Sequence, residues 1–481
     1  MKKGLFRSLL FTAIVGATFV SCGGSDDTPI IPQSLTDPVT PVDPTPETAM
    51  TVEQQKEYLG EVAQEFMRLT PTSDFQSLAD LYNYVRDTYG NSYDWSTVDE
   101  WSRTAYEAAL EALGQTSKTE ANPYMSMVMD RTVYNNYKAV IMASNFTGHF
   151  TARNGRWVRE NANDLQFVFS GQNGSQCVLS VVTSGSVKKV HLLDAMTWTN
   201  WDYKYENNIY TVSDYYDRTA LTVGIPQNIN VTLTQGGSIV AKSVLNFNLD
   251  NITTEEFDLS RNSLTMSALL ELSNGYNFNL SKIAYSANSN AALNFNVSKG
   301  AVSLISMSAA SDIHDLPSIN VSAFSGEEHI DAGNYKIENA FVKVDVLGKV
   351  QMQGTVSDVL KFSNYLEAAD DNKYDENIYK SNISEANLLA DVNLFYNGSA
   401  VKQATIKLEP FATEGYNWSW TEYQYLPATY WQSEPIICFY DGSSYSYFRA
   451  FFSEDNFGNT FNAFKALANQ YATLVGTSID W

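Results

Sequence analysis

The sequence predicts a mainly antiparallel β fold of the α+β class, with a helical segment before the strands and one helix after them. Three observations predict it. Apolar and polar residues alternate with period two over most of the chain after residue 124, short amphipathic patterns precede that point, and one long block of the β-rich part occurs twice.

The repeated block runs from Gly185 to Tyr210 and recurs, without a gap, from Gly354 to Tyr379. Both copies keep the pattern Lys-Tyr-x-x-Asn-Ile-Tyr, at 204–210 and 373–379. Repeats of this length are whole structural units rather than turns of a solenoid. The block therefore predicts two tandem β-rich repeats.

A second block follows each copy and supports the duplication. Residues 231–245 and 392–406 share a Val-x-Leu run, then Gly-Ser-x-Val after a turn. The two copies are expected to superimpose over roughly 150–260 and 325–452.

Composition and repeat together divide the chain into five segments. They are a signal peptide at 1–21, a lipid anchor and Pro/Thr-rich tether at 22–50, a helical segment at 51–123, a first β-rich repeat at 124–310, and a second β-rich repeat with a C-terminal helix at 311–481.

Three amphipathic helices are predicted in the segment before the strands. The first is expected to begin after Thr51, whose spacing from Gln54 is that of a capping box, and to stop at Pro71. The second is expected to end at Gly90, and the third covers 96–113. Each has one apolar face, so we expect the helices to cover the sheet, with a small separate bundle as the alternative.

Turn sequences between alternating runs predict the hairpins. Because the strands alternate apolar residues with Ser, Thr, Asn and Glu, one face is expected to meet a core and the other water. A final apolar stripe over 461–474 predicts the C-terminal helix. The turns are expected at Asn173-Gly174, Asn274-Gly275, Lys299-Gly300, Asn397-Gly398 and Asp441-Gly442.

The first residues have the pattern of a secretory signal. Basic residues at positions 2, 3 and 7 precede an apolar run too short for a membrane-spanning helix, and Cys22 follows it. This cysteine resembles the lipobox of bacterial lipoproteins, and the acidic run after it resembles the export tag of Bacteroidetes surface lipoproteins. The resemblance implies lipidation at Cys22 and attachment to the outer membrane by a lipid anchor, facing the extracellular side. An ordinary secreted protein is the alternative.

Two similar β-rich copies also give the chain a distant resemblance to tubular lipid-binding (BPI-like) proteins. These consist of two β-rich domains with helices in their concave faces. The resemblance rests on duplication and strand length, carries no motif, and implies a lipid ligand.

Charge excludes one class of partner. The chain has 54 Asp and Glu against 31 Lys and Arg, a net charge of −23 at pH 7. Such a chain repels phosphate backbones, so nucleic acid is not expected to bind. Cys177 and Cys438 lie in apolar strand-like runs and are expected as free thiols, with a bridge between the repeats as the alternative.

The sequence holds no H-E-x-x-H, G-x-S-x-G, Walker or C-x-x-C motif. The acidic run at 370–376 offers oxygen ligands for calcium but lacks the spacing of a calcium loop, so a solvated loop is favoured. No catalytic residue, cofactor or metal site is expected. A glycosidase, which needs only two carboxylates at a set separation, stays as the least favoured class.

Aromatic residues are the better lead to a ligand. They crowd two stretches, 198–216 and 416–431, beside Asn, Asp, Glu and Thr. Flat apolar rings next to hydrogen-bonding groups can bind sugars, although core packing is the alternative. If a strand runs through them, Trp418 and Trp420 share one face. The candidate ligand-binding residues are Trp198, Trp201, Tyr203, Trp418, Trp420 and Tyr423.

Three function classes follow from these observations. A non-catalytic surface lipoprotein that binds an extracellular glycan or lipid is favoured, a surface adhesin or assembly component is second, and a carbohydrate-active hydrolase is third. Glycan binding predicts a shallow exposed aromatic platform, lipid binding a long apolar tunnel, and an enzyme a cleft with convergent carboxylates.

Overall fold

The computed structural model of the chain describes most residues from 39 onward. Of residues 189–225, 418–419 and 445–447 it describes the backbone alone. The described ranges are 39–90, 93–94, 97–98, 147–206, 209–250, 260–315, 335–419, 421–441, 445–447, 451–474 and 476–479.

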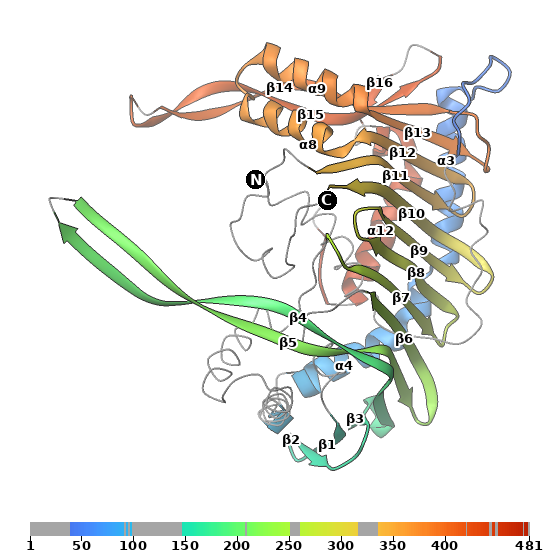
Figure 1. Cartoon of the computed structure of the whole chain (residues 1–481). Coiled ribbons are helices and arrows are strands. Elements are labelled where there is room, and N and C mark those ends of the chain that lie inside the picture. Colours follow the sequence, from blue (N-terminus) through green and yellow to red (C-terminus); the bar gives the residue numbers. More distant parts are fainter. Residues whose placement is uncertain are drawn as a thin grey trace.

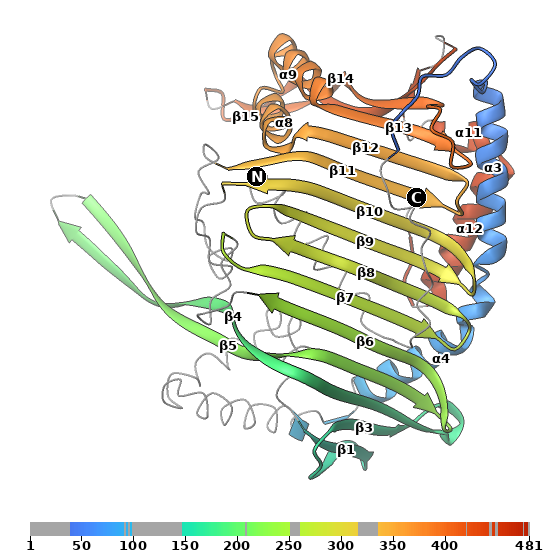
Figure 2. The same ribbon diagram turned by 45° about the vertical axis from the view of Figure 1, so that its right-hand side comes forward.

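One large sheet dominates the described structure and confirms the predicted fold class (Figures 1 and 2). Among the described residues, sixteen strands lie side by side in almost the order in which the chain makes them. Neighbouring strands are antiparallel, apart from β1 and β3, which are parallel. A meander of this kind connects each strand to the next at alternating ends of the sheet.

The first half of the sheet contains β1 (Gly148–Arg153), β2 (Arg156–Glu160), β3 (Leu165–Ser170), β4 (Gln176–Glu206), β5 (Ile209–Gln235), β6 (Ser238–Asp250), β7 (Ser263–Leu272) and β8 (Tyr276–Ser286). The second half contains β9 (Asn290–Lys299), β10 (Val302–His314), β11 (Lys336–Val346), β12 (Val350–Asp358), β13 (Ala390–Tyr396), β14 (Ala404–Ser419), β15 (Gln424–Phe439) and β16 (Tyr445–Tyr447).

The described helices precede, interrupt and follow the strands. They are α3 (Val52–Leu69), α4 (Gln76–Val85), α8 (Val359–Asp371), α9 (Glu376–Leu389), α11 (Glu454–Phe457) and α12 (Asn459–Leu474). Short turns of other helix types are η1 (Thr72–Phe75), η2 (Arg86–Gly90) and η3 (Gln172–Gly174).

Helix α3 begins where the sequence predicts. The Thr51 side chain accepts a hydrogen bond from the Gln54 N–H, and the Gln54 side chain accepts one from the Thr51 N–H. The helix then runs along one end of the strands (Figure 2). We call this the turn end of the sheet, because the tight turns after β7, β9, β11 and β13 lie there. Helix α3 therefore packs against the sheet along its turn end (Figure 2).

Two lysines next to these turns bind α3 and the short turn η1 that follows it. Lys349, after the β11–β12 turn, forms an ion pair with Glu65 of α3. Lys299, before the β9–β10 turn, donates to the Asp74 carboxylate at 2.5 Å and to the Leu69 carbonyl at 3.0 Å. The C-terminal end of α3 and the turn η1 are thus joined to the middle of the sheet.

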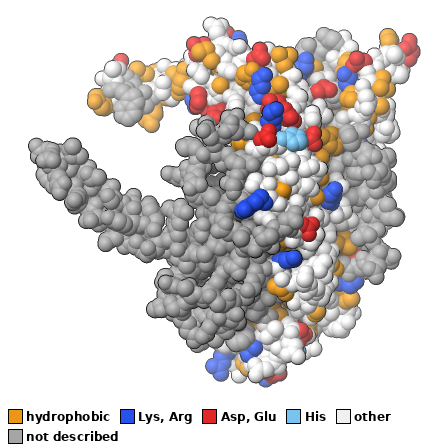
Figure 3. Space-filling view, in the orientation of Figure 1, with side chains coloured by type: hydrophobic (Ala, Val, Ile, Leu, Met, Phe, Trp, Pro, Cys, Tyr) orange, Lys and Arg blue, Asp and Glu red, His pale blue; other side chains and the backbone are white. Residues whose placement is uncertain are grey.

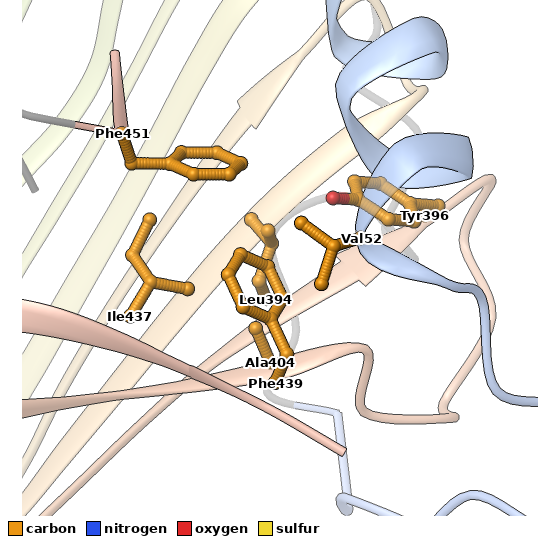
Figure 4. Close-up of a cluster of buried hydrophobic side chains, with 7 residues drawn as sticks. All are labelled: Val52, Leu394, Tyr396, Ala404, Ile437, Phe439 and Phe451. Carbon is orange, nitrogen blue, oxygen red and sulfur yellow. The ribbon is translucent and has the colours of Figure 1, made fainter. Parts of the chain in front are cut away.

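An apolar cluster lies where α3 meets the last strands (Figure 4). It contains Val52 of α3, strand residues of β13 to β15, and Phe451. A buried amide crosses this apolar interface: Gln55, 0 % exposed, donates to the Gln403 carbonyl and accepts from the Tyr396 hydroxyl, both at 2.9 Å. Every polar atom that this amide buries is therefore paired.

The last residues of the tether are bonded to the same corner of the sheet. Val42 donates its N–H to the Ala400 carbonyl at 2.8 Å and accepts from the Lys402 N–H at 2.9 Å. Val39 exchanges two hydrogen bonds with the Gln353 side chain, each 2.6 Å long. Residues 39–42 of the predicted tether are therefore held against the sheet before α3 begins.

The central strands differ from the predicted pattern of an apolar face inside and a polar face in water. One polar row crosses β8 to β12, and its members are only 1–4 % exposed: Asn279, Asn296, Ser306, Asp345 and Gln351. The expectation that this face meets water is therefore wrong here.

Hydrogen bonds within the row explain how part of it can be buried. The Asp345 carboxylate accepts from Gln351 Nε2 and from the Gly348 N–H, each at 2.6 Å. Burial raises the pKa of Asp345, and these two donors work against that rise. On the opposite, apolar face, Val342 and Met352 are 41 % and 36 % exposed.

The two copies of the repeat hold equivalent places in the sheet. In each, a strand leaves the sheet at the end opposite α3, returns as its antiparallel neighbour, and turns into a third strand. The first unit is β4–β5–β6 and the second is β12–β13–β14. The connection differs: it is a long two-stranded hairpin in the first unit and the helix pair α8–α9 in the second.

The shared Lys-Tyr-x-x-Asn-Ile-Tyr segment lies at the far end of each connection but in different local structure. Residues 204–206 and 209–210 belong to strands, whereas 373–379 form the turn between α8 and α9 and the first turn of α9. The expectation that the two segments superimpose is therefore wrong. The sheet also continues through the predicted boundary at 310–311, because β10 spans it.

Other predicted elements can be compared directly. The hairpins that turn at 173–174, 274–275, 299–300 and 397–398 are present, and α12 closes the described chain. Cys177 and Cys438 are free thiols, the first buried and the second half-buried. Most of the predicted third helix, the signal peptide and most of the tether lie outside the described residues.

Candidate functional site: the aromatic tip of the β14–β15 hairpin

The hairpin of β14 and β15 projects beyond its neighbours (Figure 1). The two strands pair at every residue from Ala404 with Phe439 to Ser419 with Gln424. Among the described residues, the neighbouring strand β13 pairs with β14 only as far as Ile406, and β16 pairs with β15 only from Ile436. The outer part of the hairpin thus continues as a two-stranded ribbon.

Two sets of hydrogen bonds show which backbone groups point out of this ribbon. The Leu408 N–H donates to Asn387 Oδ1, and its carbonyl accepts from Asn387 Nδ2. On the other strand, the Trp431 N–H donates to the Lys373 carbonyl at 2.6 Å. Backbone groups alternate in direction along a strand, so even-numbered residues of β14 and odd-numbered residues of β15 point outward.

Prolines occupy three of these outward positions: Pro410 on β14, and Pro427 and Pro435 on β15. A proline has no N–H and cannot donate to an added strand, and this protects exposed sheet edges from pairing. The projecting ribbon is therefore built to stand free rather than to be extended by another strand.

Helices α8 and α9 pack on the base of the ribbon. Leu408 and Trp431 contact a cluster that includes Tyr379 and Ile383, which are 5 % and 1 % exposed. The Lys380 ammonium lies 4.2 Å from the centre of the Trp431 ring, a cation–π contact. This packing holds the base of the ribbon against the rest of the sheet.

The tip beyond these helices exposes large aromatic rings. Tyr416, Tyr423 and Tyr425 are 69 %, 75 % and 68 % exposed, and hydrophobic side chains gather on this projection in Figure 3. Tyr416 lies opposite Pro427, and Trp418 lies opposite Tyr425. Directly opposed residues share a face, so the register places these four residues on one face of the ribbon.

The other face of the ribbon is closely packed. A Cβ atom added to Gly415 would lie 2.6 Å from a carbon of the Tyr430 ring, so this ring lies over the glycine. Tyr374, from the turn between α8 and α9, makes an edge contact with the same ring at 6.4 Å. On the face opposite Tyr416, the Tyr430 ring thus lies against both Gly415 and the Tyr374 ring.

The sequence-predicted site residues fall on two different hairpins. Tyr423 lies at the tip, in a left-handed conformation with φ 51°, and Trp418 is on β14. Trp198, Trp201 and Tyr203 lie on β4, in the long hairpin with β5, on the other side of strands β6 to β13. Cys22 and Trp420 lie outside the described residues.

The structure also adds two residues that the sequence candidates omitted, Tyr416 and Tyr425. The signal that could have found them is register. If the chain turns at about 420–423, Tyr416 lies two residues before Trp418 on the same strand, and Tyr425 lies opposite Trp418 on the returning strand. Both then fall on the same face as Trp418.

Asp375 and the His149–Asp164 pair, which could do other chemistry, are engaged in local structure. Asp375 caps α9 by accepting from the N–H groups of Asn377 and Ile378. His149 is hydrogen-bonded to Asp164 at 2.7 Å, and this bond holds the pKa of Asp164 below its ordinary value against the effect of burial. In the part of the chain that the structure describes, no group of three or more His, Cys, Asp or Glu could hold a metal ion.

Comparisons of the chain with protein-family models, with curated proteins and with solved structures found no match. Among the helices described, none combines the length and the apolar character that crossing a bilayer would require.

Proposed function

We propose that this chain is a non-catalytic surface lipoprotein that binds an extracellular glycan through the tip of the β14–β15 hairpin. One observation carries the proposal: Tyr416, Tyr423 and Tyr425 are each more than two-thirds exposed on a projection whose edges are blocked by prolines. Leaving apolar rings exposed to water costs free energy, so a group of exposed rings is expected to bind a ligand.

The chemistry of the tip suits a sugar. Tyrosine offers a flat apolar ring and a hydroxyl, and a sugar ring has apolar C–H faces and hydroxyls at its rim. Asn417 and Gln424 add amides on the opposite face of the same tip, and Gln424 Nε2 donates to Glu422 at 2.8 Å. The prolines also count against an adhesin or assembly role that works by strand addition.

Paired substitutions test the proposal. Tyr416→Ala with Tyr425→Ala should abolish retention of a neutral polysaccharide in an affinity gel, at unchanged Tm, because exposed rings contribute little to folding. The matched control is Tyr82→Ala on α4, which removes a ring that is 54 % exposed but lies on another element. Full retention by the double variant, across a panel of neutral polysaccharides that the wild type binds, would refute the site.

The proposed location has its own test. Lipidation at Cys22 would anchor the protein to the outer membrane, so Cys22→Ala should move it from the membrane fraction to the soluble fraction. The wild-type chain processed in the same cells is the reference. A variant that sediments with membranes as before would show that the anchor is not at Cys22.

Lipid binding is the second candidate, and one observation favours it. The apolar face of the central sheet is half exposed at Val342 and Met352, which are diagonal neighbours on β11 and β12. A fatty acid with a fluorescent label would report binding there. Val342→Ser should weaken that binding and leave polysaccharide retention unchanged.

A further inference from the structure

Two long hairpins leave the sheet at the same end, one from each side of its centre (Figures 1 and 2). We propose that they are two arms that hold one extended polysaccharide, so that the ligand class is a long polymer rather than a short oligosaccharide. This inference rests on the proposed function and specifies its ligand. The first arm is the β4–β5 hairpin beyond Val181, and the second is the β14–β15 hairpin beyond Ile406.

The register shows where the first arm leaves the sheet. Strand β3 pairs with β4 only as far as Val181, and β6 pairs with β5 only from Asn228. Between these points, as far as the described residues show, β4 and β5 pair only with each other. At roughly 3.3 Å per residue, this arm is about 80 Å long.

Both arms extend from the end of the sheet opposite α3. The turns that contact α3 follow β7, β9, β11 and β13, whereas both arms follow even-numbered strands, β4 and β14. In a meander, connections after odd- and even-numbered strands lie at opposite ends. The two arms therefore face the same side of the molecule.

The separation of the arms sets the size of the ligand. Eight strands, β6 to β13, lie between β5 and β14. With neighbouring strands about 4.8 Å apart, the bases of the arms are roughly 40 Å apart along the sheet. A short oligosaccharide cannot reach both arms, but an extended polymer can.

Both arms carry a pair of aromatic residues two positions apart on one strand. Trp201 and Tyr203 are two apart on β4 and so occupy the same face of that arm, as Tyr416 and Trp418 do on β14. The net charge of −23 disfavours polyanions, so the polymer is expected to be neutral or cationic. When one chain engages both sites, the second contact is intramolecular, and affinity can rise by about 10²–10⁴-fold without any new contact.

A length series tests the inference on the wild-type chain. The affinity for fragments of one neutral polysaccharide, measured by titration calorimetry, should rise slowly with length and then by at least about tenfold once the fragments span roughly 40 Å. A plateau at the length of a short oligosaccharide would show that one arm binds alone. The inference would then be wrong although the proposed function would stand.

Variants of each arm separate the two claims. Trp201→Ala with Tyr203→Ala should lower affinity for the polymer about 10–100-fold and leave affinity for a hexasaccharide at the second arm unchanged. Wild-type polymer affinity in this variant would overturn the two-arm proposal. Wild-type affinity in Tyr416→Ala with Tyr425→Ala would instead overturn the proposed function. Unchanged Tm in both variants, against Tyr82→Ala, shows that folding is preserved.

Discussion

Replacing Asp74 by Asn should destabilise the fold through one defined junction. The Asp74 Oδ2 atom accepts a hydrogen bond from the Tyr276 hydroxyl at 2.8 Å and from the Lys299 ammonium at 2.5 Å. Tyr276 is only 1 % exposed, and its hydroxyl is also 2.9 Å from the Leu69 carbonyl. The carboxylate thus joins the turn after α3 to strands β8 and β9.

The size of the effect follows from these contacts. Hydrogen bonds to a charged group contribute about 1.5–3 kcal/mol, but the Asp74 and Lys299 side chains are 24 % and 31 % exposed, and water screens part of their attraction. An asparagine also keeps one acceptor oxygen. We therefore expect Asp74→Asn to cost about 1–2 kcal/mol at pH 7, which for a chain of 481 residues is a fall in Tm of about 1–2 °C.

The effect should also depend on pH. Burial alone would raise the pKa of Asp74, but the hydrogen bonds from Lys299 and Tyr276 and the Lys299 charge together hold it below its ordinary value. A lowered carboxylate pKa contributes stability that is complete above the ordinary value of about 3.9 and is lost as pH falls through the folded-state value. The difference between wild type and variant should therefore stay constant from pH 8 to 5 and shrink below pH 4.

Urea unfolding followed by circular dichroism at pH 7, 5 and 3.5 measures this difference. The control is Asp80→Asn on α4, because Asp80 is exposed and accepts a hydrogen bond from the neighbouring Gln76 at 2.7 Å. Its free energy of unfolding should change by less than about 0.5 kcal/mol. Equal effects of the two substitutions at pH 7, or an Asp74→Asn deficit that persists unchanged at pH 3.5, would refute the reasoning.

Three further predictions concern packing and edges. Gln55→Ala should cost about 2–4 kcal/mol in urea unfolding, because it leaves a buried hydroxyl and a buried carbonyl without their partner; a loss below 1 kcal/mol would contradict this. Gly415→Ala should displace the ring on the facing strand and speed proteolysis of the tip at nearly constant Tm; an unchanged cleavage rate would show that the ring moves freely. Pro427→Thr with Pro435→Thr should restore outward N–H donors and produce dimers in analytical ultracentrifugation, whereas a monodisperse monomer would show that the prolines do not protect the edge.

Local sequence signals predicted the hairpins and the start of α3 because each depends on a few adjacent residues. Thr51 and Gln54 form the capping box, and the Asn274-Gly275 pair turns β7 into β8, as their chemistry requires. Such signals act over one turn of chain and depend little on distant contacts.

The polar row and the repeat connection could not be predicted in the same way. The burial of Asp345 depends on Gln351 and Gly348 across a turn and on neighbouring strands, none of which alternation in one strand reveals. The repeated segment adopts a strand in one copy and a helix start in the other, where Asp375 supplies the cap. Packing of α9 against Leu408 and Trp431 favours the helix there, and tertiary contacts outweigh local propensity.

For the candidate site, the sequence identified the aromatic stretch but not its exposure. Composition cannot distinguish a ring in a core from a ring on a projection, because large aromatic residues favour both. Tyr416 is exposed because its strand, β14, continues past the point where β13 stops pairing with it. Just beyond that point, the Asn387 side chain binds the N–H and the carbonyl of Leu408, which β13 would otherwise bind.

The bonds between the tether and the sheet have a mechanical consequence. If the chain is anchored by a lipid and holds a polymer, as proposed, it carries tension between the anchor and the polymer. Because Val42 is hydrogen-bonded to Ala400 and Lys402, and Val39 to Gln353, this tension enters the molecule at the β12–β14 corner before it reaches the first turn of α3. The β14–β15 arm projects from the other end of these strands, and the β4–β5 arm leaves the sheet at that same end. The load would therefore pass through the hydrogen-bonded sheet, and α3, which runs along the turns, would lie outside this path.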